Sequence, residues 1–338
     1  MRRYIIALAV VMLLGGILAA LGATWSGEPA DPVVFVAPYQ GDKAAAVSFT
    51  FDDGLPCHRQ IAAPMLADYG FRGTFYIIAG MARERKGDPI EADPRLKYGE
   101  GALSWEEIRQ IAALGHEIGN HSYSHLFLPR IAGEALLRHE VQDAAALIEE
   151  EIGQRPTTFA CPYNEMSPRV RQEILRTHEA IREPWTDWGG RAFTGATGQA
   201  LIDKAIAQRA WLVPMIHGID GGFLPLASDV LRQNLEYLQQ RQDVVWVDTF
   251  ARVSRYVRAR QAARLQVTAK HGTEARFVLS SEAASVEVPL TVVVLADDDE
   301  VTDVRAARNG EALPVRVEGS RILVEVRPGP GEVQVTWE

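Results

Sequence analysis

The sequence contains little cysteine, with only Cys57 and Cys161 among 338 residues. Two cysteines are too few for a small fold held together by disulfide bonds. Positive charge is also in deficit, because 35 Lys and Arg residues stand against 44 Asp and Glu residues, for a net charge of −9. Binding to nucleic acid depends largely on the neutralisation of phosphates, which an acidic chain does poorly. We therefore expect no nucleic-acid partner.

A long apolar run stands at the N-terminus, where Arg2 and Arg3 precede the uncharged and largely apolar residues 4–23. A basic start, an apolar stretch and small residues at its end are typical of a secretory signal peptide. A run of about 20 residues can also just span a bilayer, so it could instead remain as an uncleaved anchor. Both alternatives predict export, to the periplasm or the cell exterior, with membrane contact only through that anchor. We assign residues 1–23 to this segment and residues 24–43 to a linker.

Residues 44–263 alternate between strand-like and helix-like segments. Short apolar runs predict strands at 44–51, 71–78, 157–160, 210–216 and 243–247. Helical spacing and capping signals predict helices near 61–69, 104–114, 131–151, 168–177, 199–208 and 228–240. Such alternation predicts an α/β fold, either a parallel sheet or a (β/α) barrel, whose active loops follow the carboxyl ends of the strands.

The pattern changes after residue 264. Several strand-like runs between residues 276 and 337 are separated by Gly, Pro, Asn and Asp. This spacing predicts a small all-β, sandwich-like domain over residues 264–338. Its role stays open between packing against the preceding domain and binding glycan.

Residues with metal-binding and acid–base chemistry follow three of the predicted strands. Asp52 and Asp53 leave the first strand, although an Asp-Gly pair alone is also a common turn. His121 and His125 are four residues apart, which brings both imidazoles to one face if the loop makes a helical turn. Two His and one Asp could bind a divalent ion and leave positions open for water. His217 ends a third strand, where a lone histidine is more often structural.

Together these motifs resemble a known family. Residues 50–54 (Thr-Phe-Asp-Asp-Gly), 121–125 (His-Ser-Tyr-Ser-His) and 212–217 (Leu-Val-Pro-Met-Ile-His) look like the motifs of the polysaccharide deacetylases with a NodB homology domain, carbohydrate esterase family four. The resemblance covers about residues 44–262 and leaves the C-terminal domain unexplained. It implies a distorted (β/α) barrel and a hydrolase that removes acetyl groups from a poly- or oligosaccharide.

The resemblance also implies roles for individual residues. One divalent ion, usually zinc, would be held by three ligands: Asp53, His121 and His125. Asp52 would be the general base that takes a proton from metal-bound water, the nucleophile. His217 would protonate the leaving amine or alcohol. Tyr163 would bind the substrate and hold the oxyanion through its backbone N–H.

The third family motif departs from its usual form. The family generally has Arg-x-Pro-Tyr-Gly, whereas this chain has Ala160 in place of the arginine, followed by Cys161-Pro162-Tyr163-Asn164. Alanine cannot orient a catalytic carboxylate through a charge-assisted hydrogen bond. We expect Arg182, near the end of an apparent strand, to take that place. If both loops border one pocket, Cys57 and Cys161 are either two thiols or a disulfide pair.

The fourth motif is weaker. Asp187 and Trp188 resemble the family's Asp-Trp pair, and Trp188 either lines the sugar site or packs in the core. A histidine acid needs an orienting carboxylate, and two residues compete for that role toward His217: Asp187 and Asp248.

Three functions follow from these residues. The first is N-deacetylation of N-acetylhexosamine units, which is hydrolysis of a carbon–nitrogen bond other than a peptide bond. The second is hydrolysis of O-acetyl esters on acetylated xylan or a similar glycan. The third, suggested by Ala160, is a catalytically weak glycan-binding protein.

Overall fold

The computed structural model describes residues 31–82, 101–281, 288–297 and 300–338. The signal peptide or anchor predicted for residues 1–23 lies outside these residues. Across the described ranges, no helix is long and apolar enough to cross a membrane.

The first part of the molecule is built on parallel strands. A seven-stranded sheet has the order β7-β6-β5-β4-β3-β10-β8, and a three-stranded sheet has the order β11-β2-β9. Every pairing within these two sheets is parallel. The strands are β2 (Ala45–Val47), β3 (Thr50–Phe51), β4 (Thr74–Ile77), β5 (Glu117–Asn120), β6 (Thr158–Phe159), β7 (Ala180–Ile181), β8 (Thr186–Asp187), β9 (Trp211–Leu212), β10 (Pro214–Ile216) and β11 (Val245–Val247).

Two of the predicted strands are broken in the middle. The run 44–51 forms β2 and β3, and the run 210–216 forms β9 and β10. Each break moves the chain from the three-stranded sheet to the seven-stranded one, so the same segments bind both sheets together. This arrangement confirms the predicted distorted (β/α) barrel.

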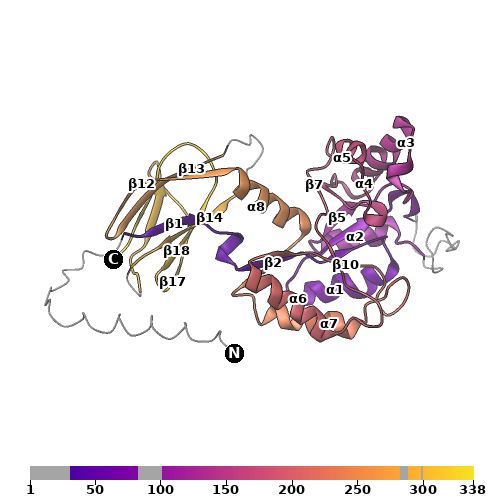
Figure 1. Ribbon diagram of the computed structural model, residues 1–338, viewed down its shortest axis with the longest axis horizontal. Helices are drawn as coiled ribbons and strands as arrows, with labels where there is room; N and C mark the ends of the chain where they lie inside the picture. The colour runs from indigo at the N-terminus through magenta and orange to yellow at the C-terminus, as the bar shows by residue number, and fades with distance from the viewer. Residues whose placement is uncertain (1–30, 83–100, 282–287, 298–299) are drawn as a thin grey trace, which may run out of the picture.

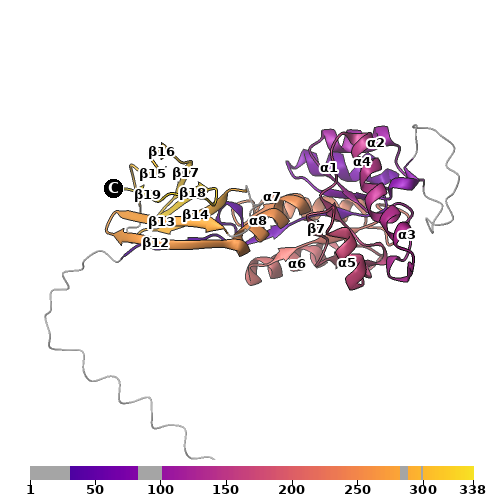
Figure 2. The same ribbon diagram turned by 90° about the horizontal axis from the view of Figure 1, so that it is seen from above.

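Helices cover the sheets, as Figures 1 and 2 show. They are α1 (Ala63–Asp68), α2 (Trp105–Ala113), α3 (Glu134–Arg138), α4 (Ala144–Ile152), α5 (Pro168–Ile174), α6 (Gly195–Gln208), α7 (Ser228–Gln239) and α8 (Phe250–Ala262). Two π-helical turns precede α1 and α4, namely η2 (His58–Ala62) and η5 (His139–Asp143). The short 3-10 turns are η1 (Gln40–Asp42), η3 (Ala79–Met81), η4 (Leu128–Arg130) and η6 (Pro162–Asn164). Ser104 and Glu107 form the predicted capping box at the start of α2.

The second part is a β-sandwich, as predicted for the C-terminal region. One sheet has the order β1-β14-β18-β17 and the other β12-β13-β19-β15-β16. Their strands are β12 (Ala263–His271), β13 (Glu274–Ser281), β14 (Leu290–Leu295), β15 (Arg305–Arg308), β16 (Glu311–Ala312), β17 (Val315–Glu318), β18 (Arg321–Val326) and β19 (Val333–Thr336). Buried Val, Leu, Ile and Phe side chains from both sheets form one core.

The linker prediction is wrong in one segment. Residues 33–36, Val-Val-Phe-Val, form β1 (Val33–Val36), which pairs antiparallel with β14. Such β-branched and aromatic residues favour a strand wherever a sheet edge is available. The chain therefore contributes a strand to the C-terminal sandwich before it enters the barrel.

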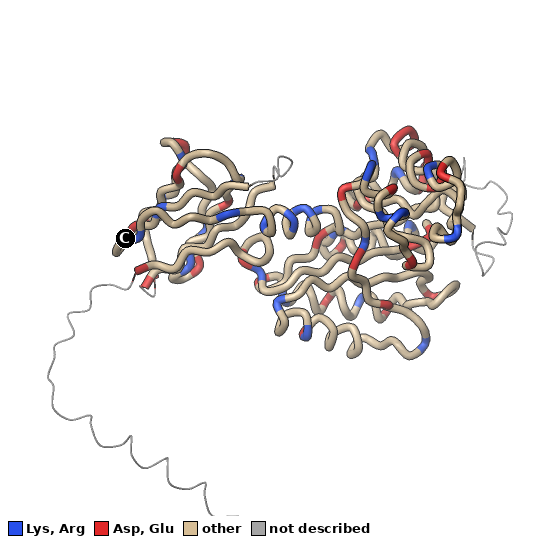
Figure 3. The backbone as a smooth tube through the Cα atoms, turned by 45° about the horizontal axis from the view of Figure 1, so that its top comes forward, with Lys and Arg blue, Asp and Glu red and all other residues tan. Residues whose placement is uncertain are grey.

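Helix α8 connects the two parts (Figure 1). Its Tyr256 is buried among sandwich residues and donates its hydroxyl to the carbonyl of Ala37 at 3.1 Å. Val253 on the same helix packs with Tyr39 and Ala46. Acidic and basic residues are interspersed over both parts (Figure 3).

Candidate active site

The predicted site residues gather at one end of the barrel because most follow the carboxyl ends of its parallel strands. Active loops in (β/α) barrels occupy this end. In chain order the strands and the residues that follow them are β3 with Asp52 and Asp53, β5 with His121 and His125, β6 with Tyr163, β7 with Arg182, and β10 with His217; Asp187 is the last residue of β8.

Asp53, His121 and His125 bring one ligand atom each to a common point. The three ligand atoms all lie within 4.8 Å of one another. Oδ1 of Asp53 is 3.4 Å from Nε2 of His121 and 3.5 Å from Nε2 of His125. With bonds of about 2.0–2.2 Å, two ligands of a tetrahedral ion lie about 3.3–3.6 Å apart. The spacing therefore fits a divalent ion.

Two further observations support this fit. Oδ1 of Asp53 is buried and has no hydrogen-bond partner. Nδ1 of His121 lies 2.8 Å from the carbonyl of Ala160, and because a carbonyl only accepts, Nδ1 carries the proton. That hydrogen bond leaves the lone pair of Nε2 directed toward Asp53, as a metal-ligating histidine requires.

The backbone around the site is strained. Positive φ angles occur at Asp53 (78°), Ser122 (70°), His125 (58°), Tyr163 (61°) and Asn164 (56°). Residues other than glycine rarely adopt this conformation, and such strain tends to cluster at functional sites. Residues 121–125 do not make a helical turn, and a loop with two left-handed residues brings the histidines together instead.

Arg182 contacts Asp52 as expected. Its Nη1 lies 2.5 Å from Oδ1 of Asp52, and both side chains are almost fully buried. Its Nη2 donates to Oδ1 of Asn164 at 2.9 Å, and its guanidinium carbon lies 5.3 Å from the ring centre of Tyr76. Gly119 makes room for that ring, because a Cβ there would lie 2.4 Å from Cε1 of Tyr76.

The charges of the site support one another. Burial alone would raise the pKa of Asp52, but Arg182 and His121 outweigh it and hold the pKa below its usual value. Burial likewise opposes ionisation of Asp53, while His121 and His125 keep its pKa well below the usual range. Burial together with the charge of His121 lowers the pKa of His125 to about 4. Against the effect of burial, the neighbouring carboxylates of Asp52 and Asp53 in turn raise the pKa of His121. Ionised carboxylates and neutral imidazoles are the forms that bind metal, so a bound ion would take the place of the proton on His121.

Tyr163 and His217 border the cluster. Tyr163 is 51% exposed, and its ring centre lies 4.8 Å from that of His125. The carbonyl of His217 lies 2.8 Å from Nε2 of the buried His58, and its ring packs edge-on against Phe223 at 5.0 Å. His58 thus ties the end of β10 to the turn after β3, because its Nδ1 accepts from the N–H of Leu55.

The structure gives Asp248 partners other than the predicted His217. Val247 pairs with Val47, so Asp248 stands level with Ser48, four residues before Asp52. Its carboxylate instead binds Arg252 at 2.6 Å, and accepts from the Thr249 N–H at 2.8 Å, at the start of α8.

The two residues of the fourth motif, Asp187 and Trp188, differ in burial. Asp187 ends β8 with an exposed side chain, and within the described ranges no carboxylate lies at ion-pair distance from the His217 ring. Trp188 is only 1% exposed and packs against Phe49 and Phe193. Its burial favours packing over contact with a sugar.

No disulfide joins the two cysteines of the chain. Cys161 donates its thiol to the carbonyl of Glu165 at 2.9 Å. Burial raises the pKa of this thiol to about 12. Of the two alternatives left open by the sequence, the structure has the thiols.

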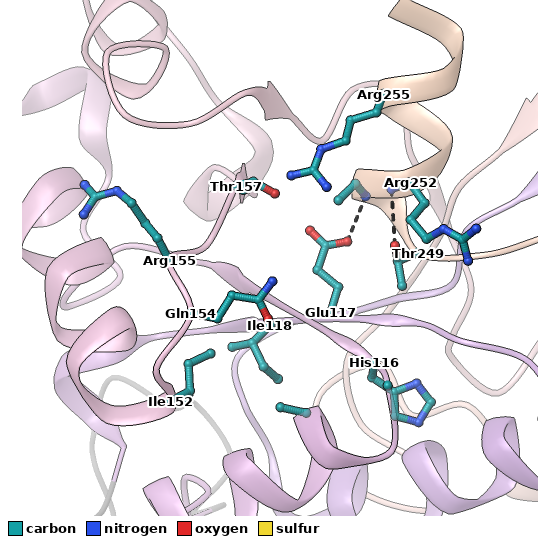
Figure 4. A pocket seen from close by; sticks show the side chains of 13 residues that line it. His116, Glu117, Ile118, Ile152, Gln154, Arg155, Thr157, Thr249, Arg252 and Arg255 are labelled. Carbon is teal, nitrogen blue, oxygen red and sulfur yellow. Dashed lines mark hydrogen bonds between the residues drawn. The ribbon is translucent and has the colours of Figure 1, made fainter. Parts of the chain in front are cut away.

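A cavity of about 220 Å³ lies at the opposite end of the barrel strands, where β5 and α8 begin (Figure 4). Glu117, the first residue of β5, points there toward the start of α8 and accepts from the N–H of Ala251 at 2.8 Å. The lining arginines are already paired: Arg155 with Glu149, Arg252 with Asp248 and Arg255 with Glu179. This end of a barrel generally serves stability rather than chemistry.

The fold and this site resemble those of polysaccharide deacetylases. Residues 40–180 match the family model described as polysaccharide deacetylase, which confirms the resemblance seen in the motifs. The match includes Asp52, Asp53, His121, His125 and Tyr163, and ends before Arg182 and His217.

Individual proteins similar to this chain act on several glycans according to their names. A gellan lyase from a Bacillus species is 24% identical, over 89% of this chain and 13% of its own length. A chitooligosaccharide deacetylase from Sinorhizobium fredii is 28% identical, over 54% of this chain and 67% of its own length. The chain thus spans only a small part of the gellan lyase.

Solved structures are also similar to part of this chain. A family 4 acetyl xylan esterase from Clostridium thermocellum, determined with a cobalt ion, is 20% identical with a TM-score of 0.45. The similarity covers 62% of this chain and 89% of the esterase.

Sequence reasoning missed two residues that support the site. Asn164 stands where the family has glycine, and Asn is the side chain that best tolerates the left-handed conformation there. Glu140 contacts the loop that carries both histidines. Only the Asn-for-Gly exchange left a signal in the sequence.

Proposed function

We propose that this chain is a metal-dependent hydrolase that removes acetyl groups from a poly- or oligosaccharide, with N-acetylhexosamine units as the favoured substrate. One observation carries the proposal: Asp53, His121 and His125 converge on one point beside a separate carboxylate, Asp52, that is paired with Arg182. A cluster with a purely structural role would not require the carboxylate of Asp52 next to that of Asp53.

The three ligands would hold one divalent ion, zinc in the simplest case. When bound, such an ion supplies Lewis acidity, which polarises a carbonyl oxygen and lowers the pKa of water. This chemistry suits hydrolysis of an acetyl group. The remaining work falls to residues of the chain.

Asp52 is the proposed general base. Arg182 occupies its Oδ1, so Oδ2, which lies 4.0 Å from Nε2 of His121, faces the ligand cluster and can accept the proton of the attacking water. Arg182 thereby takes the role of the family's arginine, whose position Ala160 occupies in this chain. The buried ion pair also fixes the carboxylate's orientation, on which general-base catalysis depends.

His217 and Tyr163 are the proposed partners of the substrate. His217 would donate a proton to the leaving amine. The exposed ring of Tyr163, beside His125, would contact the acetylated sugar, and its backbone N–H would bind the oxygen that gains negative charge. The basic and apolar start of the chain supports export as the setting.

O-acetyl ester hydrolysis is the second candidate. It is favoured by one observation, that among the described residues no carboxylate is paired with the His217 ring. An imidazole without such a partner is less well oriented to donate a proton to a leaving group. An alcohol leaves with less need of protonation than an amine does, so ester hydrolysis depends less on proton donation by His217.

Acetate release decides between these functions. The zinc-loaded protein is incubated with chitin oligosaccharides and with acetylated xylan, beside Asp52→Asn and a surface control, Asp68→Asn. We expect release from chitin oligosaccharides that Asp52→Asn abolishes and Asp68→Asn retains. Release from xylan alone would reassign the chain to ester hydrolysis. Zinc binding without release from any acetylated glycan would leave a binding protein and refute the catalytic proposal.

A further inference from the structure

We infer that Glu140 is a positioning residue that holds the loop of both histidine ligands in its metal-binding conformation. Residues 121–125 are called the histidine loop below. The inference rests on the proposed metal site, because it concerns how two of the three ligands are placed. Glu140 lies outside that loop, in the π-helical turn η5 (His139–Asp143) that precedes α4.

The histidine loop has an unfavourable backbone. Ser122 and His125 both have positive φ angles, which cost free energy for residues with a Cβ atom. Local hydrogen bonds offset part of that cost, since the N–H of Ser122 donates to Oδ1 of Asn120 and the N–H of His125 to Oγ of Ser122, both at 2.9 Å. The two residues between them need partners from elsewhere.

Glu140 supplies those partners. Its Oε2 accepts from the N–H of Ser124 at 2.9 Å, and its Oε1 accepts from the hydroxyl of Ser124. Its backbone carbonyl accepts from the N–H of Tyr123 at 3.0 Å. One residue therefore satisfies both central N–H groups of the loop and fixes one side chain.

The residues on either side of Glu140 also contact this part of the chain. The ring of His139 packs on that of Tyr123 with 4.2 Å between centres, and the carbonyl of Val141 accepts from Nδ2 of Asn120 at 3.0 Å. Three successive residues of the π turn thus contact the segment 120–124. Turns of this kind recur at functional sites, where they re-aim side chains that a regular helix would point elsewhere.

The burial of Glu140 indicates that its carboxylate is placed there to bind the histidine loop. Its side chain has no exposed surface, and in the part of the chain that the structure describes no Lys or Arg lies within ion-pair distance. A buried carboxylate is costly unless hydrogen bonds compensate it. Here the compensation comes from Ser124, so the acid and the loop depend on each other.

The consequence concerns metal affinity. Both imidazoles are carried on five consecutive residues, so a change in loop conformation alters their separation and their distance from Asp53. Without the Glu140 side chain the partly buried N–H of Ser124 loses its acceptor, which favours a rearranged loop. Groups that orient metal ligands typically change affinity by about 10–100-fold when they are removed.

The test measures metal binding rather than activity. Zn²⁺ affinity of the full chain is determined by competition with a chelator, and the thermal unfolding midpoint is recorded with and without Zn²⁺. Glu140→Met removes both side-chain acceptors at similar volume, and we expect about tenfold weaker binding or more and a smaller metal-induced rise of the midpoint. Glu140→Gln keeps one acceptor and is expected to lie in between.

Two controls separate positioning from general destabilisation. Ile148→Val trims the core contact of α4, and Glu150→Gln changes an exposed carboxylate of the same helix. Both should keep wild-type affinity, even where the midpoint of the metal-free protein falls. If Glu140→Met does not fold, Ser124→Ala removes the same side-chain contact from the loop and should weaken binding several-fold.

The outcomes are distinct from those of the proposed function. Wild-type affinity in Glu140→Met, or in both Glu140→Gln and Ser124→Ala, overturns the inference and leaves the metal site standing. Failure of the wild-type chain to bind any divalent ion overturns the metal site and the inference with it. In Co²⁺-loaded protein, an altered visible absorption spectrum in the Glu140 variants would show that the ligand arrangement itself has changed.

Discussion

Arg182 and Asp52 form a buried ion pair with a separation of 2.5 Å, although they lie 130 residues apart in the sequence. The arginine comes from the end of β7, and its own N–H donates to the carbonyl of Phe159, the residue before Ala160. It therefore reaches Asp52 from the strand adjacent to the one that precedes Ala160.

Exchanging the two positions should restore what a single substitution removes. Arg182→Ala should abolish acetate release and lower the free energy of unfolding by about 3–5 kcal/mol, because it leaves a buried carboxylate unpaired. Adding Ala160→Arg should recover part of both. Chemical denaturation and acetate release measure the two effects, with Arg191→Ala as an exposed control. If the double variant has no more activity or stability than Arg182→Ala, the position after β6 does not accommodate an arginine side chain.

Removal of the metal or of one ligand should have the same effect. His125→Ala and treatment with a chelator should each abolish acetate release, and Zn²⁺ should restore activity only to the chelated wild type. Metal content by elemental analysis provides the direct measurement. His271→Ala, at the exposed end of β12, should keep both metal and activity. Activity that survives complete metal removal would contradict the proposed chemistry.

Tyr163 and Trp188 should separate function from stability. Tyr163→Ala removes an exposed ring, so kcat/KM should fall while the free energy of unfolding changes little. Trp188→Ala empties part of the core and should cost about 3–5 kcal/mol of stability. Trp188→Phe should cost less, since it keeps most of the volume and removes a buried indole N–H that has no partner. Loss of activity without loss of stability in Trp188→Phe would instead indicate contact with the substrate.

Glu117 should make stability depend on pH. Burial raises its pKa above the ordinary value, even though Thr158, Thr74 and the N–H of Ala251 donate to it. Between the ordinary and the raised pKa the folded state holds a proton that the unfolded state has released, so stability falls as pH rises through this range. Urea denaturation at several pH values should show that fall in the wild type and in Glu150→Gln, and a flatter profile in Glu117→Gln. Equal slopes in all three would exclude this contribution.

Much of the site was predictable because its chemistry follows strands. A buried strand that ends in two carboxylates, or in a histidine, is visible in the sequence, and parallel strands bring their carboxyl ends together. Arg182 contacts Asp52 for the same reason, because it also follows a parallel strand. Sequence patterns do not reveal that β2 and β3 are separate strands. Because β11 pairs with β2 and not with β3, Asp248 follows a strand of the three-stranded sheet.

Other features depend on geometry that periodicity does not encode. A π turn differs from a helix by one residue per turn, so the inward direction of Glu140 is lost in a pattern based on 3.6 residues. The left-handed residues of the histidine loop are Ser and His, neither of which signals such a conformation as glycine does. Residues 33–36 form a strand only because a sheet edge from the other end of the chain lies beside them.

The pairing of β1 with β14 has a mechanical consequence. The polypeptide contributes β1 to the sandwich before it enters the barrel, and it returns to the sandwich after α8. The chain therefore both enters and leaves the barrel from the sandwich. A pulling force applied between residue 33 and the C-terminal strand β19 would load the sandwich and its β1–β14 ladder first. The catalytic barrel would carry no tension until that ladder had sheared, and its site would keep its shape while the molecule was tethered and stretched.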